Sequence, residues 1–145
     1  MYRLIQLTLC LYFFTIASFT TATELAQLVL TVHGLTPNQG QVKVAVHTQE
    51  EEFLGKADIK SSQAVRQQDT VTFIFDLKPG TYAVSSFYDV NMNDELDTNF
   101  LFIPTEPVGF ANQPSSRFGP PSFEDAAIEV GRKKMINITL KPIFE

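Results

Sequence analysis

The stretch of sequence that decides the fold class is Val71-Thr72-Phe73-Ile74-Phe75-Asp76-Leu77-Lys78-Pro79-Gly80. Its first seven residues place an apolar side chain on every second position, which is the period of a strand with one buried face. Pro79 and Gly80 then favour a turn, because Pro fixes φ and Gly tolerates a positive φ. A second strand, 81–89, is therefore predicted to lead out of that turn.

The same alternation recurs toward both ends of the chain. Residues 28–33 and 42–47 flank a connection with Pro, Asn and Gly, and 127–130 and 136–140 flank Gly131. Each pair predicts a β-hairpin. The polar stretch 48–68 is predicted to hold no more than one short helical turn. Six or seven short strands with turn signals between them indicate an all-β sandwich.

Length and composition limit the class of protein. A chain of 145 residues is the size of one ordinary domain, and 44% hydrophobic with 19% charged residues excludes a disordered chain. The net charge of −5 argues against a nucleic-acid partner, because phosphate binding needs clustered Lys and Arg. Cations, neutral ligands or proteins are the expected partners.

An export signal is predicted at the N-terminus. Residues 1–22 combine one early cation, Arg3, with an uncharged apolar run and small residues ending at Ala22. The mature chain is then a single domain, 23–145, without a membrane span, in the periplasm or secreted. The one cysteine, Cys10, is lost with the signal, which excludes thiol chemistry. An uncleaved anchor and a lipoprotein at Cys10 are the alternatives.

One loop has the spacing of a metal site. Oxygen-bearing side chains stand at alternate positions from residue 89, and no Lys or Arg occurs from Pro79 to Ser116. Ca²⁺ takes about six to eight oxygen ligands, and closely spaced carboxylates repel one another unless a cation neutralises them. The sequence therefore predicts a Ca²⁺ site, with a solvated Asx-turn loop as the alternative. The candidate ligands are Asp89, Asn91, Asn93 and Asp97, with Glu95 offering its carbonyl.

A long Pro- and Phe-rich loop, 100–123, follows. Its five prolines exclude a helix or a central strand, and its five phenylalanines indicate a packed loop rather than a disordered one. Most of these rings are expected to pack on the sandwich, and one or two, above all Phe110 and Phe118, to stay exposed; packing of all five is the alternative. The predicted ligand or partner surface is Glu106, Phe110, Asn112, Arg117 and Phe118.

Signals for catalysis are weak. His33 and His47 fall on the polar sides of their strands and are predicted to face solvent. There is no Gly-x-Ser-x-Gly motif and no glycine-rich phosphate loop. An enzyme acting on a polar sugar or peptide would have to use Asp97, Glu106 or Arg117.

A string of motifs resembles one bacterial family, domain of unknown function 2141, whose members are small exported proteins. The motifs are Phe75 to Val84, Asp89 to Asn93, Leu96 to Asn99, Ile103 to Glu106, Gly109 to Asn112 and Phe118 to Ala126. The resemblance implies an immunoglobulin-like or transthyretin-like antiparallel β-sandwich. The chain departs from the family pattern at Tyr88, where His is usual, and at Asp94 and Phe102, where Gly is usual.

Three functions are consistent with these features. The first is an exported, non-enzymatic module in which Ca²⁺ orders an aromatic binding loop for a small ligand or an envelope protein. The second is the cell-envelope enzyme just described. The third is a structural module of the envelope with neither metal nor ligand.

Overall fold

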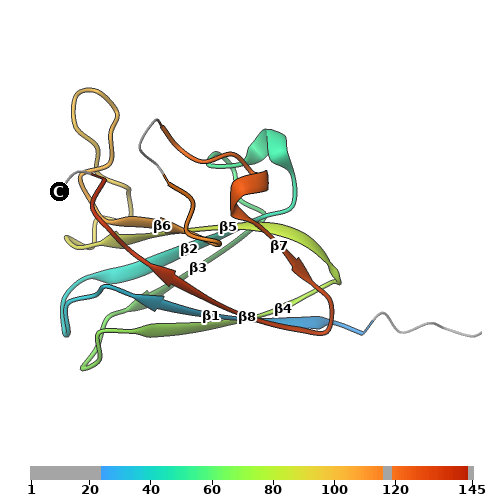
Figure 1. Cartoon of the computed structure of the whole chain (residues 1–145). Helices are drawn as coiled ribbons and strands as arrows, with labels where there is room; N and C mark the ends of the chain where they lie inside the picture. The colour runs from blue at the N-terminus through green and yellow to red at the C-terminus, as the bar shows by residue number, and fades with distance from the viewer. Residues whose placement is uncertain (1–23, 116–118, 144–145) are drawn as a thin grey trace, which may run out of the picture.

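Two stacked β-sheets form the molecule. The computed structural model describes residues 24–115 and 119–143, and Figure 1 shows the sheets as two layers with several loops rising from the upper one. The first sheet contains β1 (Ala26–His33), β4 (Val71–Leu77) and β8 (Lys133–Thr139), in the order β4-β1-β8. Strand β1 pairs antiparallel with β4 and parallel with β8.

The second sheet is larger and mainly antiparallel. It has the order β3-β2-β5-β6, and β7 also pairs with β5. Its strands are β2 (Gln41–His47), β3 (Ile59–Ala64), β5 (Gly80–Asp89), β6 (Val108–Phe110) and β7 (Ala127–Val130). Two short 3₁₀ turns, η1 (Glu50–Glu52) and η2 (Glu124–Ala126), lie in the connections. The all-β sandwich predicted from the alternation is confirmed.

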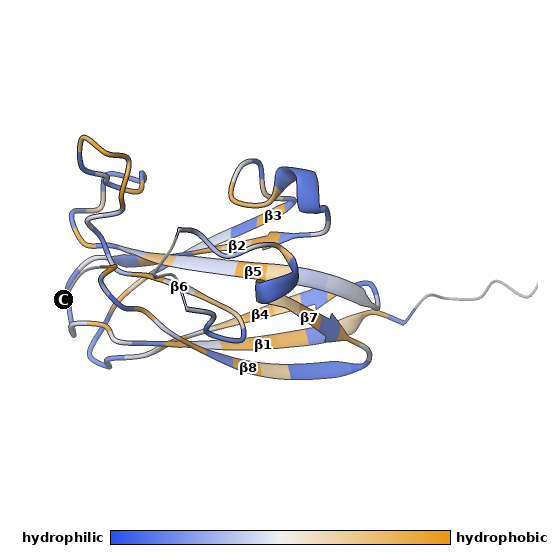
Figure 2. Cartoon of the chain, turned by 45° about the horizontal axis from the view of Figure 1, so that its top comes forward, coloured by the Kyte–Doolittle hydropathy of each residue, from blue (hydrophilic) through white to orange (hydrophobic). Residues whose placement is uncertain are grey.

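The core lies between the sheets, where alternate residues of each strand meet. In β1 and β4, every second side chain is no more than 8% exposed. Figure 2 shows long hydrophobic stretches, in orange, along β1 and β4. Burial of one such aliphatic or aromatic side chain contributes about 1.5–3 kcal/mol. The main contributors are Leu28, Leu30, Val32, Val42, Val46, Phe73, Phe75, Val84, Val130 and Ile138.

Both predicted terminal hairpins are wrong. Strands β1 and β2 belong to different sheets, and so do β7 and β8. The connection 34–40 crosses from one sheet to the other instead of reversing within one. Tyr88, which is 3% exposed, stabilises this connection. Its hydroxyl donates to the carbonyl of Gln39 at 2.7 Å and accepts from the amide of Thr36 at 3.3 Å.

The described residues hold eight strands, against the six or seven predicted, and β3 accounts for part of the difference. Residues 59–64 were assigned to the polar stretch because they lack an apolar period. Strand β3 lies at the edge of its sheet and has no fully buried residue, so its sequence needed no alternation. The short helical turn predicted in the same stretch is η1.

The predicted signal segment, 1–22, lies outside the described residues. Among the residues that are described, no helix is long and apolar enough to cross a membrane.

Candidate functional site

A groove of about 760 Å³ lies on the outer face of the larger sheet. Three segments rise from that face and form its walls: 91–105, 48–58, and the residues before η2 (Figure 1). The wall residues that contact the groove are mainly apolar, including Leu54, Leu96, Phe102, Ile103 and Pro120.

The strand register determines the floor of the groove. Ala45 of β2 is opposite Lys60 on one side and Ser85 on the other, and Ser85 is opposite Phe110 of β6. The next row along the strands holds the side chains of Ser62, Lys43, Phe87 and Val108. The floor is therefore polar and cationic along β2 and β3, and apolar along β5 and β6.

His47 lies at one end of this face, and its predicted exposure to solvent is wrong. The side chain is 1% exposed, and its ring meets Phe53 edge to face at 5.2 Å. Phe53 also contacts Phe110 and Phe123, with ring centroids at 6.5 and 5.9 Å. The alternation placed His47 on the outer face correctly, but the segment 48–58 covers that face.

Both ring nitrogens of His47 are buried without a hydrogen-bond partner among the described residues. A buried polar atom left unpaired costs about 1–3 kcal/mol. Burial lowers the pKa of His47 below its ordinary value, against the opposing charge of Asp58 and the backbone and charge of Glu52. Burial therefore favours the neutral imidazole at pH 7, and the residue lines the groove.

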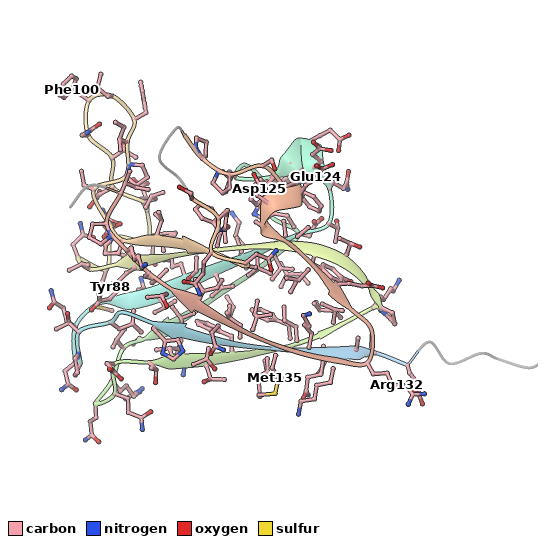
Figure 3. All side chains as sticks on the ribbon, in the orientation of Figure 1. Tyr88, Phe100, Glu124, Asp125, Arg132 and Met135 are labelled. Carbon is pink, nitrogen blue, oxygen red and sulfur yellow. The ribbon has the colours of Figure 1, made fainter. Side chains whose placement is uncertain are left out.

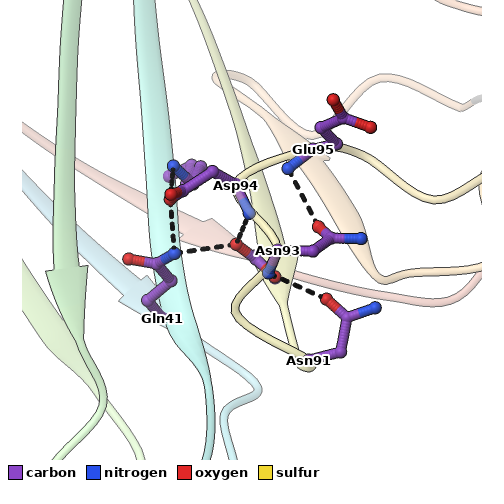
Figure 4. Close-up of polar contacts among 7 residues, drawn as sticks. Gln41, Asn91, Asn93, Asp94 and Glu95 are labelled. Carbon is purple, nitrogen blue, oxygen red and sulfur yellow. Dashed lines mark hydrogen bonds and ion pairs between the residues drawn. The ribbon is translucent and has the colours of Figure 1, made fainter.

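Asp89 organises the loop that was predicted to bind metal. Its side chain is fully buried and accepts three hydrogen bonds, from the amides of Asn93 at 3.1 Å and Asp94 at 2.9 Å, and from Nε2 of Gln41 at 2.8 Å. Figure 4 shows these contacts. A carboxylate that takes several N–H groups can fix the course of a loop without a cation.

The remaining candidate ligands continue this pattern. The Oδ1 atoms of Asn91 and Asn93 accept the amides two residues further on, at 3.0 and 2.9 Å, which are Asx turns. Their Nδ2 groups donate to the two oxygens of Asp97, at 2.6 and 3.1 Å. Glu95 is exposed and contributes only its amide to these contacts. The five predicted ligands thus lie in one loop.

Strand β2 provides the cation that the sequence around the loop lacks. Nζ of Lys43 lies 2.6 Å from Oδ1 of Asp94, which also accepts from Gln41 at 2.8 Å. The hydrogen bond from Lys43 and then that from Gln41 lower the pKa of Asp94. In the part of the chain that the structure describes, no group of three or more His, Cys, Asp or Glu side chains is placed to hold a metal.

Glu106, predicted to be part of a ligand surface, closes the base of the same loop. It is 6% exposed, and its carboxylate accepts the amides of Val90 at 2.8 Å and Asp97 at 3.2 Å. The bond to Val90 joins the two ends of segment 91–105, and the bond to Asp97 ties its middle to the same carboxylate. Both Asp97 and Glu106 therefore hold hydrogen bonds within the loop.

Segment 91–105 ends in an exposed apolar tip. Phe100, Leu101 and Phe102 are 88%, 60% and 87% exposed, and Figure 3 shows Phe100 at the far end of the loop. Oδ1 of Asn99 accepts the amides of Leu101 and Ile103 and holds the turn. Phe102 has φ 60° and Asp94 has φ 72°, a backbone region that glycine adopts most readily.

The predicted assignment of exposed aromatic rings is therefore wrong in part. Phe110 was expected to be exposed, but it is half-buried against Phe53, and the exposed rings are Phe100 and Phe102. Phe110 lies on β6, where the ring of Phe53 packs against it. A side chain at the tip of a narrow loop has no such neighbour to pack on.

Asn112, another predicted surface residue, hydrogen-bonds the backbone at the start of β7. Asn112 donates to the carbonyls of Ala127 at 2.8 Å and Asp125 at 3.2 Å, which ties the loop to β7. Arg117 and Phe118 lie outside the described residues.

Sequence reasoning missed the groove and three of its polar side chains, Lys43, Lys60 and His47. The alternation does put Lys43 and His47 on the outer face of β2, which was the available signal, whereas Lys60 lies in a strand without an apolar period. No local pattern shows that loops from distant parts of the chain build walls around that face.

A family model described as "Uncharacterized protein conserved in bacteria (DUF2141)" matches residues 30–138. No curated protein and no solved structure matches the chain. The matched range includes every strand except part of β1 and the last residue of β8.

Proposed function

The chain belongs to the bacterial family DUF2141, whose function is unknown, and from this premise we propose that it is an exported, non-enzymatic module that binds a ligand in the groove of its larger sheet. The observation that carries the proposal is the groove itself, about 760 Å³ with mainly apolar walls. Small-molecule sites in proteins typically have volumes of about 300–1,000 Å³ and apolar linings with a few polar groups.

The arrangement of side chains supports binding rather than catalysis. The carboxylates of Asp97 and Glu106 each accept hydrogen bonds that hold the loop. The polar groups that line the groove are Asp94 and lysine, serine and histidine side chains of β2, β3 and β5. Among these described residues, no serine hydroxyl hydrogen-bonds a side-chain base, and Ser86 donates to a backbone carbonyl.

A neutral apolar dye tests the groove. Nile red is expected to bind with a rise in fluorescence, and Ala45→Trp, which places a large ring on the groove floor, is expected to weaken binding roughly tenfold or more. The matched control is Ile74→Trp, because Ile74 is 62% exposed on the smaller sheet. Equal binding by Ala45→Trp and the unmodified protein would contradict the proposal, provided that the variant melts as a folded protein.

The location of the protein is part of the same proposal. The charge and apolar pattern of residues 1–22 supports export to the periplasm or the medium, with removal of that segment. Mass spectrometry of the protein from its native host is expected to find an N-terminus near Thr23. Mature envelope protein that begins at Met1 would contradict it.

We propose further that the loop 89–97 takes Ca²⁺. The backbone amides of this short segment donate to the side-chain oxygens of Asp89, Asn91 and Asn93. The backbone therefore curves around these three side chains. Amide and carbonyl oxygens are ordinary Ca²⁺ ligands, and a set built largely from them needs few carboxylates. The side-chain amides that now bond Asp97 would have to turn away from it.

Melting with and without Ca²⁺ tests this site. At free Ca²⁺ about 100 times the Kd, the stabilisation is about 2.7 kcal/mol, which raises Tm by several degrees in a domain of this size. Asp97→Asn is expected to reduce that rise in Tm, because it removes one of the negative charges that bound Ca²⁺ would neutralise. The same Tm in Ca²⁺ and in chelator would contradict the site.

A further inference from the structure

The two sides of the groove differ in chemistry, and this difference indicates what the groove binds. Along β5 and β6 the floor presents Phe87, Val108 and Phe110. Along β2 and β3 it presents Lys43, Lys60 and Ser62. A ligand that contacts both sides must have an apolar body and a polar part that accepts hydrogen bonds.

The charges on the groove favour an anionic acceptor. Lys43 is paired with Asp94 at 2.6 Å, and among the described residues Lys60 forms no salt bridge. Asp94 is the one carboxylate among the described residues that line the groove, so Lys60 gives this lining a net positive charge. Outside the lining, the carboxylates of Asp58 and Glu52 act on His47, and Asp58 accepts two hydrogen bonds from Thr48. The protein as a whole has a net charge of −5, which makes this local excess of positive charge distinctive.

His47 provides an independent indication of a polar ligand group. Its ring is 1% exposed and lines the groove. Neither nitrogen makes a hydrogen bond of good geometry among the described residues, and the one backbone group that acts on the ring is that of Glu52. Because Ala45 is opposite Lys60 in the register, His47 and Lys60 are diagonal neighbours on one face, a separation of about 7–8 Å between backbones. One small anionic group can therefore meet both side chains.

Resting on the proposed binding function, we infer that the groove takes an apolar carboxylate: a hydrocarbon body along Phe87, Val108 and Phe110, and a single carboxylate head at Lys60 and His47. The ammonium of Lys60 supplies the charge. The imidazole donates one N–H to the head, and the edge of Phe53 shifts to admit it. The exposed Leu96 and Phe102 of segment 91–105 add apolar surface to the groove wall.

Dodecanoate and dodecan-1-ol are the probes, because they share a chain and differ in the charge of the head. Displacement of Nile red below micellar concentrations is expected to show dodecanoate binding roughly tenfold more tightly. Lys60→Met is expected to remove most of that preference and to leave dodecan-1-ol binding unchanged. Lys133→Met is the matched control, because Lys133 is an exposed lysine on a strand of the other sheet.

His47→Phe keeps an aromatic ring against Phe53 and removes the hydrogen-bonding nitrogens. It is expected to weaken dodecanoate binding several-fold while Tm stays the same or rises, since it also removes two unpaired buried atoms.

The outcomes separate this inference from the function on which it rests. Equal binding of the acid and the alcohol, unaffected by Lys60→Met, would overturn the carboxylate inference and leave groove binding in place. An effect of Lys60→Met without one of His47→Phe would overturn the part given to His47. Failure of Nile red and both probes to bind would overturn the proposed function together with the inference.

Discussion

Asp89→Ala is expected to lower the free energy of unfolding by about 3 kcal/mol or more, because it removes the acceptor of three hydrogen bonds to a buried carboxylate. The carboxylate is fully buried and joins the amides of Asn93 and Asp94 to the side chain of Gln41 on β2. Hydrogen bonds to a charged group contribute about 1.5–3 kcal/mol each, and the three are not additive because they hold one loop.

Asp94→Ala is the matched control. Asp94 lies in the same loop, but its side chain is 73% exposed, and its contact with Lys43 is a surface ion pair. Solvent screens such a pair, so Asp94→Ala is expected to unfold close to the unmodified protein. Urea unfolding followed by far-UV circular dichroism measures both variants. Equal urea midpoints for Asp89→Ala and the unmodified protein would contradict the prediction. They would show that water replaces the carboxylate without loss of stability.

Gly34→Ala is expected to destabilise the protein by about 3 kcal/mol or more, for two independent reasons. Gly34 has φ +85°, where residues with a Cβ are strained, and an added Cβ would lie 2.6 Å from the carbonyl oxygen of Leu140. That oxygen belongs to the backbone beside β1, where the amide of Leu140 donates to the carbonyl of His33. Neither atom can move without opening the end of the sheet.

Gly131→Ala isolates the steric effect from the general effect of replacing a glycine. A Cβ at Gly131 would meet no atom within 4 Å, and its φ is not in the left-handed region. The expected change is within about 0.5 kcal/mol, or a small gain from the less flexible unfolded chain. A comparable loss of stability in Gly34→Ala and Gly131→Ala would contradict the prediction. It would mean that the steric contact at Gly34 does not cause the destabilisation.

Individual strands could be predicted from the sequence where one face alone is buried. Residues 71–77 and 81–89 were assigned correctly, because Phe73, Phe75 and Val84 pack on the core while their neighbours do not. The pairing of strands could not be predicted. A Pro- and Gly-containing connection of seven residues suits a hairpin and a crossing equally well, and the choice depends on which pairing buries Leu28 and Val42 on facing sheets.

The candidate site was predictable only where its residues are close in sequence. The loop 89–97 has alternate Asp and Asn residues, but Gln41 and Lys43, which hydrogen-bond Asp89 and Asp94 from β2, are about 50 residues away in the sequence. His47 shows the same limit, because the alternation gives the face of a strand and not what covers that face.

The parallel pairing of β1 with β8 also affects how the chain folds. Gln27 is opposite Lys133, so the central strand of the smaller sheet is completed by residues about 100 positions further along the chain. Contacts between such distant segments form slowly, since the loop between them must first be closed at an entropic cost. We expect the apolar edge of β1 to stay unpaired until the last strand has been synthesised, so that aggregation competes with folding during that interval.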